Sequence, residues 1–192
     1  MSLSESSMLA LGTEAPDFAL PDTEGNIVRR DDFRGAPGLA VAFICNHCPF
    51  VQHIADGLAA FGREYGERGL GIVAINANDP GSHPADSPEK MREEKTRRGY
   101  PFPYLFDESQ AVAKAYGAVC TPDFFLFDGD FRLVYRGRFD GSTPGREVPV
   151  TGADLRAAAD ALLEGRPVPE EQLPSMGCNI KWRAGNAPPY AR

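Results

Sequence analysis

Uninterrupted apolar runs alternate with helical periodicity in the first half of the chain. Residues 39–44 and 70–75 each have the length of a strand and contain no polar side chain. This pattern is typical of strands that are covered on both faces. Between them, apolar residues recur every three or four positions over 50–61. This spacing predicts an amphipathic helix that begins at Pro49 and ends near Gly66.

Shorter elements follow the same alternation in the second half. Ser87 is a suitable N-cap for a charged helix that ends at Arg98. The sequence then predicts, in order, a strand over 104–106, a helix over 109–116, a hairpin of 124–127 with 133–135, and a last helix over 155–163. Near the N-terminus, apolar runs on both sides of a turn at 22–25 indicate a further hairpin within 12–35.

This order of elements predicts an α/β fold with a central mixed β-sheet flanked by helices. The length of 192 residues suits one domain, which we place at 12–164 with the hairpin as its N-terminal extension. Residues 1–11 are expected to be disordered or loosely ordered. Residues 165–192 carry five prolines and no periodicity over the whole stretch, so we expect an irregular C-terminal tail that packs on the domain.

Charge and hydropathy exclude several classes of function. A formal charge of −7 argues against nucleic acid or an anionic membrane surface as a partner. No run approaches the roughly 18 consecutive apolar residues of a transmembrane helix. The first residues lack a cationic segment followed by an apolar run. A cytoplasmic location is therefore expected, and no residue pattern calls for a cofactor.

The cysteines supply the candidate chemistry. Of the four, Cys45 and Cys48 form a C-x-x-C pair, whereas Cys120 and Cys178 are isolated. The pair lies where a buried strand meets a helix, and a helix N-terminus favours a thiolate over a thiol. We therefore predict a redox-active disulfide in which Cys45 is the nucleophile and Cys48 resolves the mixed disulfide. A protonated His47 beside the thiolate would stabilise it and make the disulfide a stronger oxidant.

Three motifs give the chain a resemblance to a known family. They are Ala15-Pro16-Asp17-Phe18-x-Leu20, Cys45-x-x-Cys48-Pro49 and Cys120-Thr121-Pro122-Asp123-Phe124. Together they resemble the thioredoxin superfamily, on its peroxiredoxin-like branch (alkyl hydroperoxide reductase/thiol-specific antioxidant) with a C-N-H-C-P motif. The resemblance spans about residues 12–163, and the tail at 174–182 is similar to the same group.

The resemblance implies a thioredoxin-like fold and a set of site residues. In thioredoxins a cis-proline precedes a strand and lies against the C-x-x-C motif, and Pro122 holds the matching place. A cis bond there would present the backbone of Thr121 to an incoming peptide or thiol. Thr121 and Asn46 are therefore expected to bind the substrate. The expected catalytic residues are Cys45, His47, Cys48 and Pro122.

The chain also departs from the family patterns. Peroxiredoxins carry P-x-x-x-T-x-x-C, in which the last cysteine attacks the peroxide. In the alignment that places Cys48 at that cysteine, Val41 replaces the proline and Cys45 replaces the threonine. The peroxiredoxin arginine falls near Pro122. These changes argue against efficient peroxidase activity, although Cys48 keeps the peroxidatic position. Ile44 stands where thioredoxins have tryptophan.

Two isolated cysteines leave alternatives open. Cys120 lies two residues before Pro122, so it is either a buried small hydrophobe or an additional redox thiol. Cys178 could fold back as a further resolving thiol or pair with Cys120. A tetrahedral zinc site needs about four ligands, usually as two separated pairs. Only one C-x-x-C pair is present, so no metal is expected. His83 and Asp86 are interpreted as solvated loop residues.

These observations favour a thiol–disulfide oxidoreductase. Its substrate would be a protein or small-molecule disulfide or thiol, and a cellular dithiol would reduce the Cys45–Cys48 disulfide again. The alternative is a thiol peroxidase in which Cys48 becomes a sulfenic acid and Cys45 condenses with it. A metal-binding or scaffold protein is the less favoured third class. The substrate, the direction of electron flow, the electron donor and the oligomeric state stay open.

Overall fold

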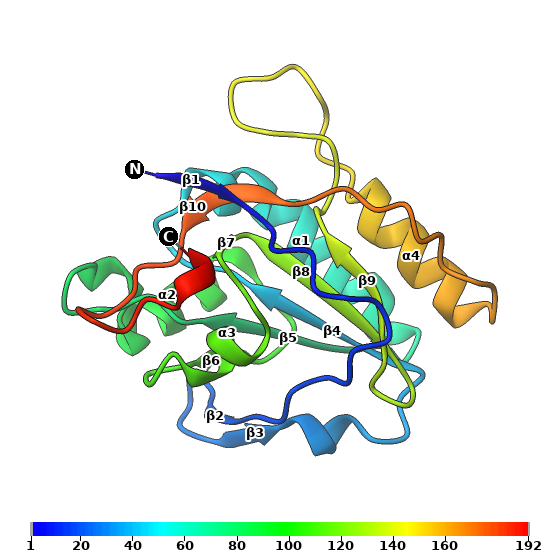
Figure 1. The fold of residues 1–192 in the computed structure, drawn as a ribbon, viewed down its shortest axis with the longest axis horizontal. Helices are drawn as coiled ribbons and strands as arrows, with labels where there is room; N and C mark the ends of the chain where they lie inside the picture. The colour runs from blue at the N-terminus through cyan, green and yellow to red at the C-terminus, as the bar shows by residue number, and fades with distance from the viewer. Residues whose placement is uncertain (1, 192) are drawn as a thin grey trace.

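A five-stranded mixed sheet forms the centre of the molecule, in a computed structural model that describes residues 2–191 (Figure 1). The strand order is β6-β5-β4-β8-β9. The strands are β4 (Gly38–Phe43), β5 (Gly71–Asn76), β6 (Tyr104–Phe106), β8 (Asp123–Asp128) and β9 (Leu133–Gly137). β4, β5 and β6 are parallel, whereas β8 runs antiparallel to β4 and to its other neighbour β9. The sheet confirms the predicted α/β class.

Helices cover both faces of this sheet. They are α1 (Pro49–Glu67), α2 (Pro88–Arg98), α3 (Ala111–Ala115) and α4 (Ala153–Leu163), with the short 3₁₀ helices η1 (Arg30–Phe33), η2 (Pro84–Asp86) and η3 (Pro189–Ala191). Side chains of α1, α2 and α4 belong to the core on one face, and α3 packs into the core on the other. Every residue of β4 and β5 is buried, because successive side chains point into opposite cores.

The two hairpins predicted from the sequence are confirmed. β2 (Ala19–Pro21) pairs antiparallel with β3 (Ile27–Arg29), and β8 pairs with β9. Ser87 caps α2 by accepting a hydrogen bond from the Lys90 N–H, as its position predicted. The apolar periodicity of α1 likewise faces the core. Local patterning therefore accounts for most of the central domain.

The two ends of the chain form a second, smaller sheet. Its order is β1-β10-β7, from β1 (Leu3–Glu5), β10 (Met176–Asn179) and β7 (Cys120–Thr121), all antiparallel. Figure 1 shows β1 and β10 side by side along the upper edge of the molecule. The tail was expected to be irregular and the N-terminus loosely ordered. The structure differs because each of these short strands gains its hydrogen bonds from a distant partner, which local periodicity does not reveal.

The helices of the described chain were also compared with the dimensions of a bilayer. Within residues 2–191, none combines the length and the apolar character that crossing a membrane requires.

Candidate functional site

The C-x-x-C motif lies at the junction between β4 and α1. Cys45 follows the end of β4, and Cys48 is the N-cap of α1 with Pro49 in the first turn. Proline is tolerated there because the first N–H groups of a helix have no intrahelical partner. All four cysteines are buried, and no disulfide joins them in the described part of the chain. The predicted strand-to-helix placement of the motif is therefore what the structure shows.

The peptide bond between Thr121 and Pro122 is cis, as the resemblance implied. Thr121 lies against both sulfurs of the motif. Its hydroxyl is 3.4 Å from Cys45 Sγ, and its carbonyl oxygen is 3.3 Å from Cys48 Sγ. The loop before β8 thus covers the redox motif directly.

Cys48 has the sulfur that is best placed to carry negative charge. Interactions with the Cys45 thiol, the Cys178 thiol and the Val51 N–H all favour negative charge on it, and as a thiol it donates to the Thr121 carbonyl oxygen and to Cys178 Sγ. The three favourable interactions lower the pKa of Cys48 to about 5, with the Cys45 bond the largest contribution. Burial, followed by the Cys48 bond and the charge of Asp86, raises the pKa of Cys45 well above its ordinary value.

These directions make Cys48 the more acidic thiol, whereas the sequence-based prediction gives the nucleophile to Cys45, and that assignment stays a prediction. The largest cause of the low Cys48 pKa is the hydrogen bond from Cys45, and the position of Cys48 at the start of the helix adds to it. Cys48 rather than Cys45 occupies the N-cap, so the unpaired N–H groups of the first turn favour a thiolate on Cys48. Sequence spacing placed both cysteines near the helix start but did not determine which of them caps it.

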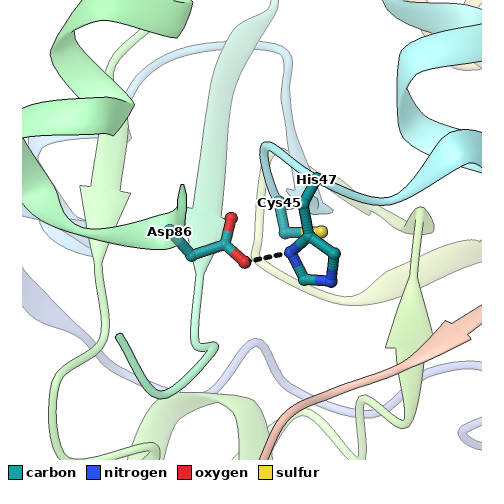
Figure 2. Close-up of side chains that lie close together, drawn as sticks. All are labelled: Cys45, His47 and Asp86. Atoms are coloured by element: carbon teal, nitrogen blue, oxygen red, sulfur yellow. Dashed lines mark hydrogen bonds and ion pairs between the residues drawn. The ribbon is translucent and has the colours of Figure 1, made fainter. Parts of the chain in front are cut away.

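A buried carboxylate fixes His47 beside the motif. Figure 2 shows the Nδ1 atom of His47 directed at Asp86, with the Cys45 sulfur next to the imidazole ring. The hydrogen bond to Asp86 raises the pKa of His47 more than burial lowers it. Histidine is therefore held in its protonated form at a higher pH than in solution, which supports the charge predicted for it.

Asp86 itself is the site residue that sequence analysis missed. It was expected in a solvated loop, yet its side chain is fully buried. Its carboxylate accepts hydrogen bonds from the Asn46 N–H at 2.7 Å and from the Asn78 side chain at 2.9 Å, besides His47. Burial alone would raise its pKa, but these bonds lower it below the ordinary value. The surrounding loop is rich in Pro, Gly and Ser, and this composition gave no signal that Asp86 is buried.

Further loop contacts extend the same cluster. The ring of His83 stacks on that of His47, with centroids 5.0 Å apart. His83 was expected as an isolated loop histidine, but the turn that buries Asp86 carries it to the motif. Burial and the neighbouring charge of His47 lower the pKa of His83. The positive charge in this cluster is consequently held by His47.

The two residues expected to bind substrate have internal partners instead. Asn46 Oδ1 accepts a hydrogen bond from the Tyr104 hydroxyl at 2.8 Å, and Asn46 Nδ2 donates to the Ala85 carbonyl at 2.9 Å. Thr121 is opposite Cys178 in the pairing of β7 with β10. Asn46 therefore ties the motif to the loop before α2, and the backbone edge of Thr121 is occupied by the chain's own C-terminal strand.

The isolated cysteines occupy different environments. Cys178 lies with its sulfur 2.9 Å from Cys48 Sγ. Cys120 is buried near Pro122, and burial raises its pKa well above the ordinary value. In the β7–β10 register Cys178 is opposite Thr121, while Cys120 is opposite Asn179. Opposed residues share one face of a sheet, so Cys178 and Cys120 point to different faces and are not arranged as a pair.

Three possible metal ligands also meet within the described chain. Ligand atoms of Cys45, His47 and Asp86 lie within 4.8 Å of one another. However, both Asp86 oxygens already accept hydrogen bonds from amide donors, and Nδ1 of His47 is engaged by the same carboxylate. An ion would have to displace these bonds, and three ligands fall short of the about four of a closed zinc site. The donor set fits an ion pair better than a metal centre.

Asp86→Asn is expected to lower the pKa of His47, because the carboxylate is the main cause of its elevation. Unfolding free energy should fall by about 1–3 kcal/mol through lost charge-assisted hydrogen bonds. Asp86 has a lowered pKa, so its stabilisation is lost as pH falls below 3.8. His47 has a raised pKa, so its stabilisation is full below 6.5 and is lost as pH rises past its folded value. The loss of unfolding free energy in Asp86→Asn should therefore be largest between pH 3.8 and pH 6.5.

NMR titration of the His47 ring and denaturant unfolding across pH provide the measurement. Glu89→Gln, an exposed change of equal charge in the adjoining helix, is the control and should leave the pKa of His47 nearly unchanged. An unaltered His47 titration in the Asp86 variant would refute the assignment.

Comparison with known proteins places this geometry among thiol redox proteins. A sequence model of the AhpC/TSA family matches residues 11–136. The thiol-disulfide oxidoreductase ResA of Geobacillus thermodenitrificans (strain NG80-2) is 32% identical over 126 residues, which cover 65% of this chain and 67% of ResA. A crystal structure of an uncharacterized conserved protein from Geobacillus kaustophilus is 53% identical, with a TM-score of 0.94, covering 97% of this chain and 99% of that one.

A more distant structure confirms the fold class. The thioredoxin domain of a thiol-disulfide oxidoreductase from Bacteroides vulgatus is 18% identical and superposes with a TM-score of 0.59, covering 77% of this chain and 97% of that domain. The predicted thioredoxin-like fold, with its mixed sheet and flanking helices, is thereby confirmed.

Proposed function

Since the chain belongs to the AhpC/TSA family, we propose that it is a thiol–disulfide oxidoreductase whose redox couple is Cys45–Cys48. The observation that carries this proposal is the pair of sulfurs at the strand-to-helix junction, with Cys48 at the N-cap and its pKa lowered by its hydrogen bonds. The ResA relatives support the same reaction. The substrate would be a protein or small-molecule disulfide or thiol in a reducing compartment such as the cytoplasm.

The reaction consists of two exchange steps. The Cys48 thiolate attacks one sulfur of the substrate disulfide, a Cys48–substrate disulfide forms, and the other substrate sulfur leaves as a thiolate that takes up a proton. Cys45 then loses its proton and attacks Cys48. This second step forms the Cys45–Cys48 disulfide and releases the remaining substrate thiol. A cellular dithiol returns the protein to its reduced form, and every step is reversible.

His47 and Asp86 manage the proton in this scheme. The imidazolium of His47 can protonate the departing thiolate, and the resulting neutral ring can accept the proton of Cys45, whose sulfur lies within 4.8 Å of the ligand atoms of the pair. Asp86 keeps the ring oriented through Nδ1. His47 thus acts as the acid and base, and Asp86 is a positioning residue.

A thiol peroxidase is the second candidate, because the thiolate at Cys48 also suits attack on a peroxide. In that reaction Cys48 takes the terminal oxygen as a sulfenic acid, the alcohol or water leaves, and condensation with Cys45 yields the disulfide and water. In peroxiredoxins a threonine and an arginine hold the peroxide. Here Cys45 stands in place of the threonine, and the position of the arginine falls near Pro122. We therefore expect peroxide turnover to be slow.

The two reactions are separated by following the reduced protein against two oxidants. Oxidised glutathione should convert it to the Cys45–Cys48 disulfide, located by mass spectrometry of peptides, and dithiothreitol should reverse the change. Hydroperoxide should be consumed no faster than by free cysteine in stopped-flow. Failure of oxidised glutathione to produce that disulfide would refute the oxidoreductase, and rapid peroxide consumption would favour the peroxidase.

A further inference from the structure

The strand β10 lies against the redox motif in the position of a peptide ligand. It pairs antiparallel with β7, so Cys178 is directly opposite Thr121, the residue of the cis peptide bond that contacts both sulfurs of the motif. On its other side β10 is held by β1. An extended segment with a cysteine is therefore fixed by main-chain hydrogen bonds beside the C-x-x-C pair.

Gly177 makes this close approach possible. A Cβ atom at this position would lie 1.9 Å from the carbonyl oxygen of Thr121 and 3.2 Å from the Pro122 ring. Any side chain there would push β10 away from the loop. The backbone is thus built to bring the next residue, Cys178, as near to the motif as chain contact permits.

The sulfur atoms are arranged around Cys48. Its Sγ is 2.9 Å from Sγ of Cys178 and also receives a hydrogen bond from Cys45. A disulfide bond is about 2.05 Å long, so bond formation needs a movement of less than about 1 Å along that line. Cys48 can therefore bond to either neighbour without rearrangement of the fold.

We propose that Cys178 is a third redox thiol, which attacks Cys48 and converts the Cys45–Cys48 disulfide into a Cys48–Cys178 disulfide. This inference rests on the proposed function. In the step the Cys48–Cys178 bond forms and the Cys45–Cys48 bond breaks. Cys178 gives up a proton, and Cys45 leaves as a thiolate and takes one up, so no external oxidant is required. The same attack on a Cys48–substrate disulfide releases the substrate.

The charges explain why Cys178 acts only after oxidation. In the reduced protein burial, together with the hydrogen bond and negative charge of Cys48, raises the pKa of Cys178 to about 12. There it stays protonated beside Cys48. Once Cys48 is part of a disulfide, that hydrogen bond and that charge no longer oppose ionisation, and Lys181 still favours it.

The three sulfurs of the site are all buried, which limits how they can react. Cys45 is 2% exposed and Cys48 is fully buried, while Cys178 is 1% exposed. All three sulfurs are therefore shielded, and a bulky substrate or reductant reaches Cys48 only when β10 moves away. The exchange transfers the bond to a residue of β10 and liberates Cys45 beside His47. The redox state then depends on whether β10 remains docked.

The test uses Cys45→Ser, which leaves Cys48 and Cys178 as neighbours. After reduction and treatment with oxidised glutathione, acid quenching and digestion should give a Cys48–Cys178 peptide as the main product. In Cys45→Ser/Cys178→Ser the Cys48–glutathione adduct should instead accumulate at least about tenfold more, because a fixed thiol outcompetes one in solution. Cys45→Ser/Cys120→Ser is the matched control and should still form the Cys48–Cys178 disulfide.

Wild-type protein is analysed in parallel, which separates the two proposals. Persistence of the Cys48–glutathione adduct in Cys45→Ser, with a Cys45–Cys48 disulfide in the wild type, would overturn the role of Cys178 and leave the oxidoreductase intact. Absence of the Cys45–Cys48 disulfide in the wild type would overturn the proposed function. Partial isomerisation in the wild type, seen as alkylation of Cys45 in the oxidised protein, would support the third thiol. Thermal unfolding of each variant confirms that it is folded.

Discussion

Replacing Cys48 with serine is expected to lower the rate of thiol–disulfide exchange by about a thousandfold or more. Cys48 is the N-cap sulfur and its pKa is about 5. The remaining sulfurs of the site have raised pKa values, that of Cys45 through burial above all and that of Cys178 to about 12. A serine at position 48 therefore removes the most acidic thiol of the site, and it also removes the sulfur shared by both disulfides.

The ultraviolet absorbance of the thiolate provides the measurement. In the wild type the signal should vanish as pH falls through about 5. Cys45→Ser should keep a low-pH transition, because a hydroxyl can still donate to Cys48, whereas Cys48→Ser should show none below about pH 8. Cys120→Ser is the control, because Cys120 is a buried cysteine whose sulfur donates to the Pro122 carbonyl rather than to the sulfur of Cys48. A low-pH thiolate that survives in Cys48→Ser would return the nucleophile to Cys45.

The second large effect is expected from Gly177→Ala. The added methyl group would lie 1.9 Å from the Thr121 carbonyl, so β10 must separate from β7. We expect a loss of about 1–3 kcal/mol in unfolding free energy. Amide exchange over 176–179 should accelerate, and Cys178 should react with a maleimide at least about tenfold faster, since local opening governs both. The Cys48–Cys178 disulfide should form correspondingly less.

A glycine elsewhere supplies the control for this substitution. Gly66 lies exposed near the end of α1, and a Cβ there would meet no atom within 4 Å. Gly66→Ala should stabilise the protein by up to about 1 kcal/mol and leave Cys178 unreactive. Equal maleimide reactivity in the Gly177 variant and the wild type would show that β10 is not held by this contact.

Hydrophobic patterning predicted the elements that have one local cause. The runs at 39–44 and 70–75 became β4 and β5, because strands buried on both faces need apolar residues at every position. The apolar spacing after Pro49 corresponds to α1, because a helix that is buried on one face has apolar residues every three or four positions. The motif at their junction followed from these two elements, and so did its redox chemistry.

The features that sequence analysis missed depend on distant contacts. Asp86 is buried because amide groups of Asn46 and Asn78 surround it, and an acidic residue in a Pro-Gly-Ser loop carries no mark of such partners. β10 exists as a strand through β1 and β7, which are more than fifty residues away along the chain. The cysteine that caps the helix was not evident from the sequence, because the first residue of a helix is set by one turn of geometry.

The separation of Cys48 and Cys178 by 130 positions gives the two disulfides very different effects on the unfolded chain. Cys45–Cys48 closes a loop of a few residues, whereas Cys48–Cys178 would close most of the molecule. In the loop-entropy description the long closure stabilises the folded state by about 5 kcal/mol, roughly 3 kcal/mol more than the short one. Transfer of one covalent bond would therefore convert an oxidised protein whose unfolded chain is almost unconstrained into one whose unfolded chain is closed into a large loop.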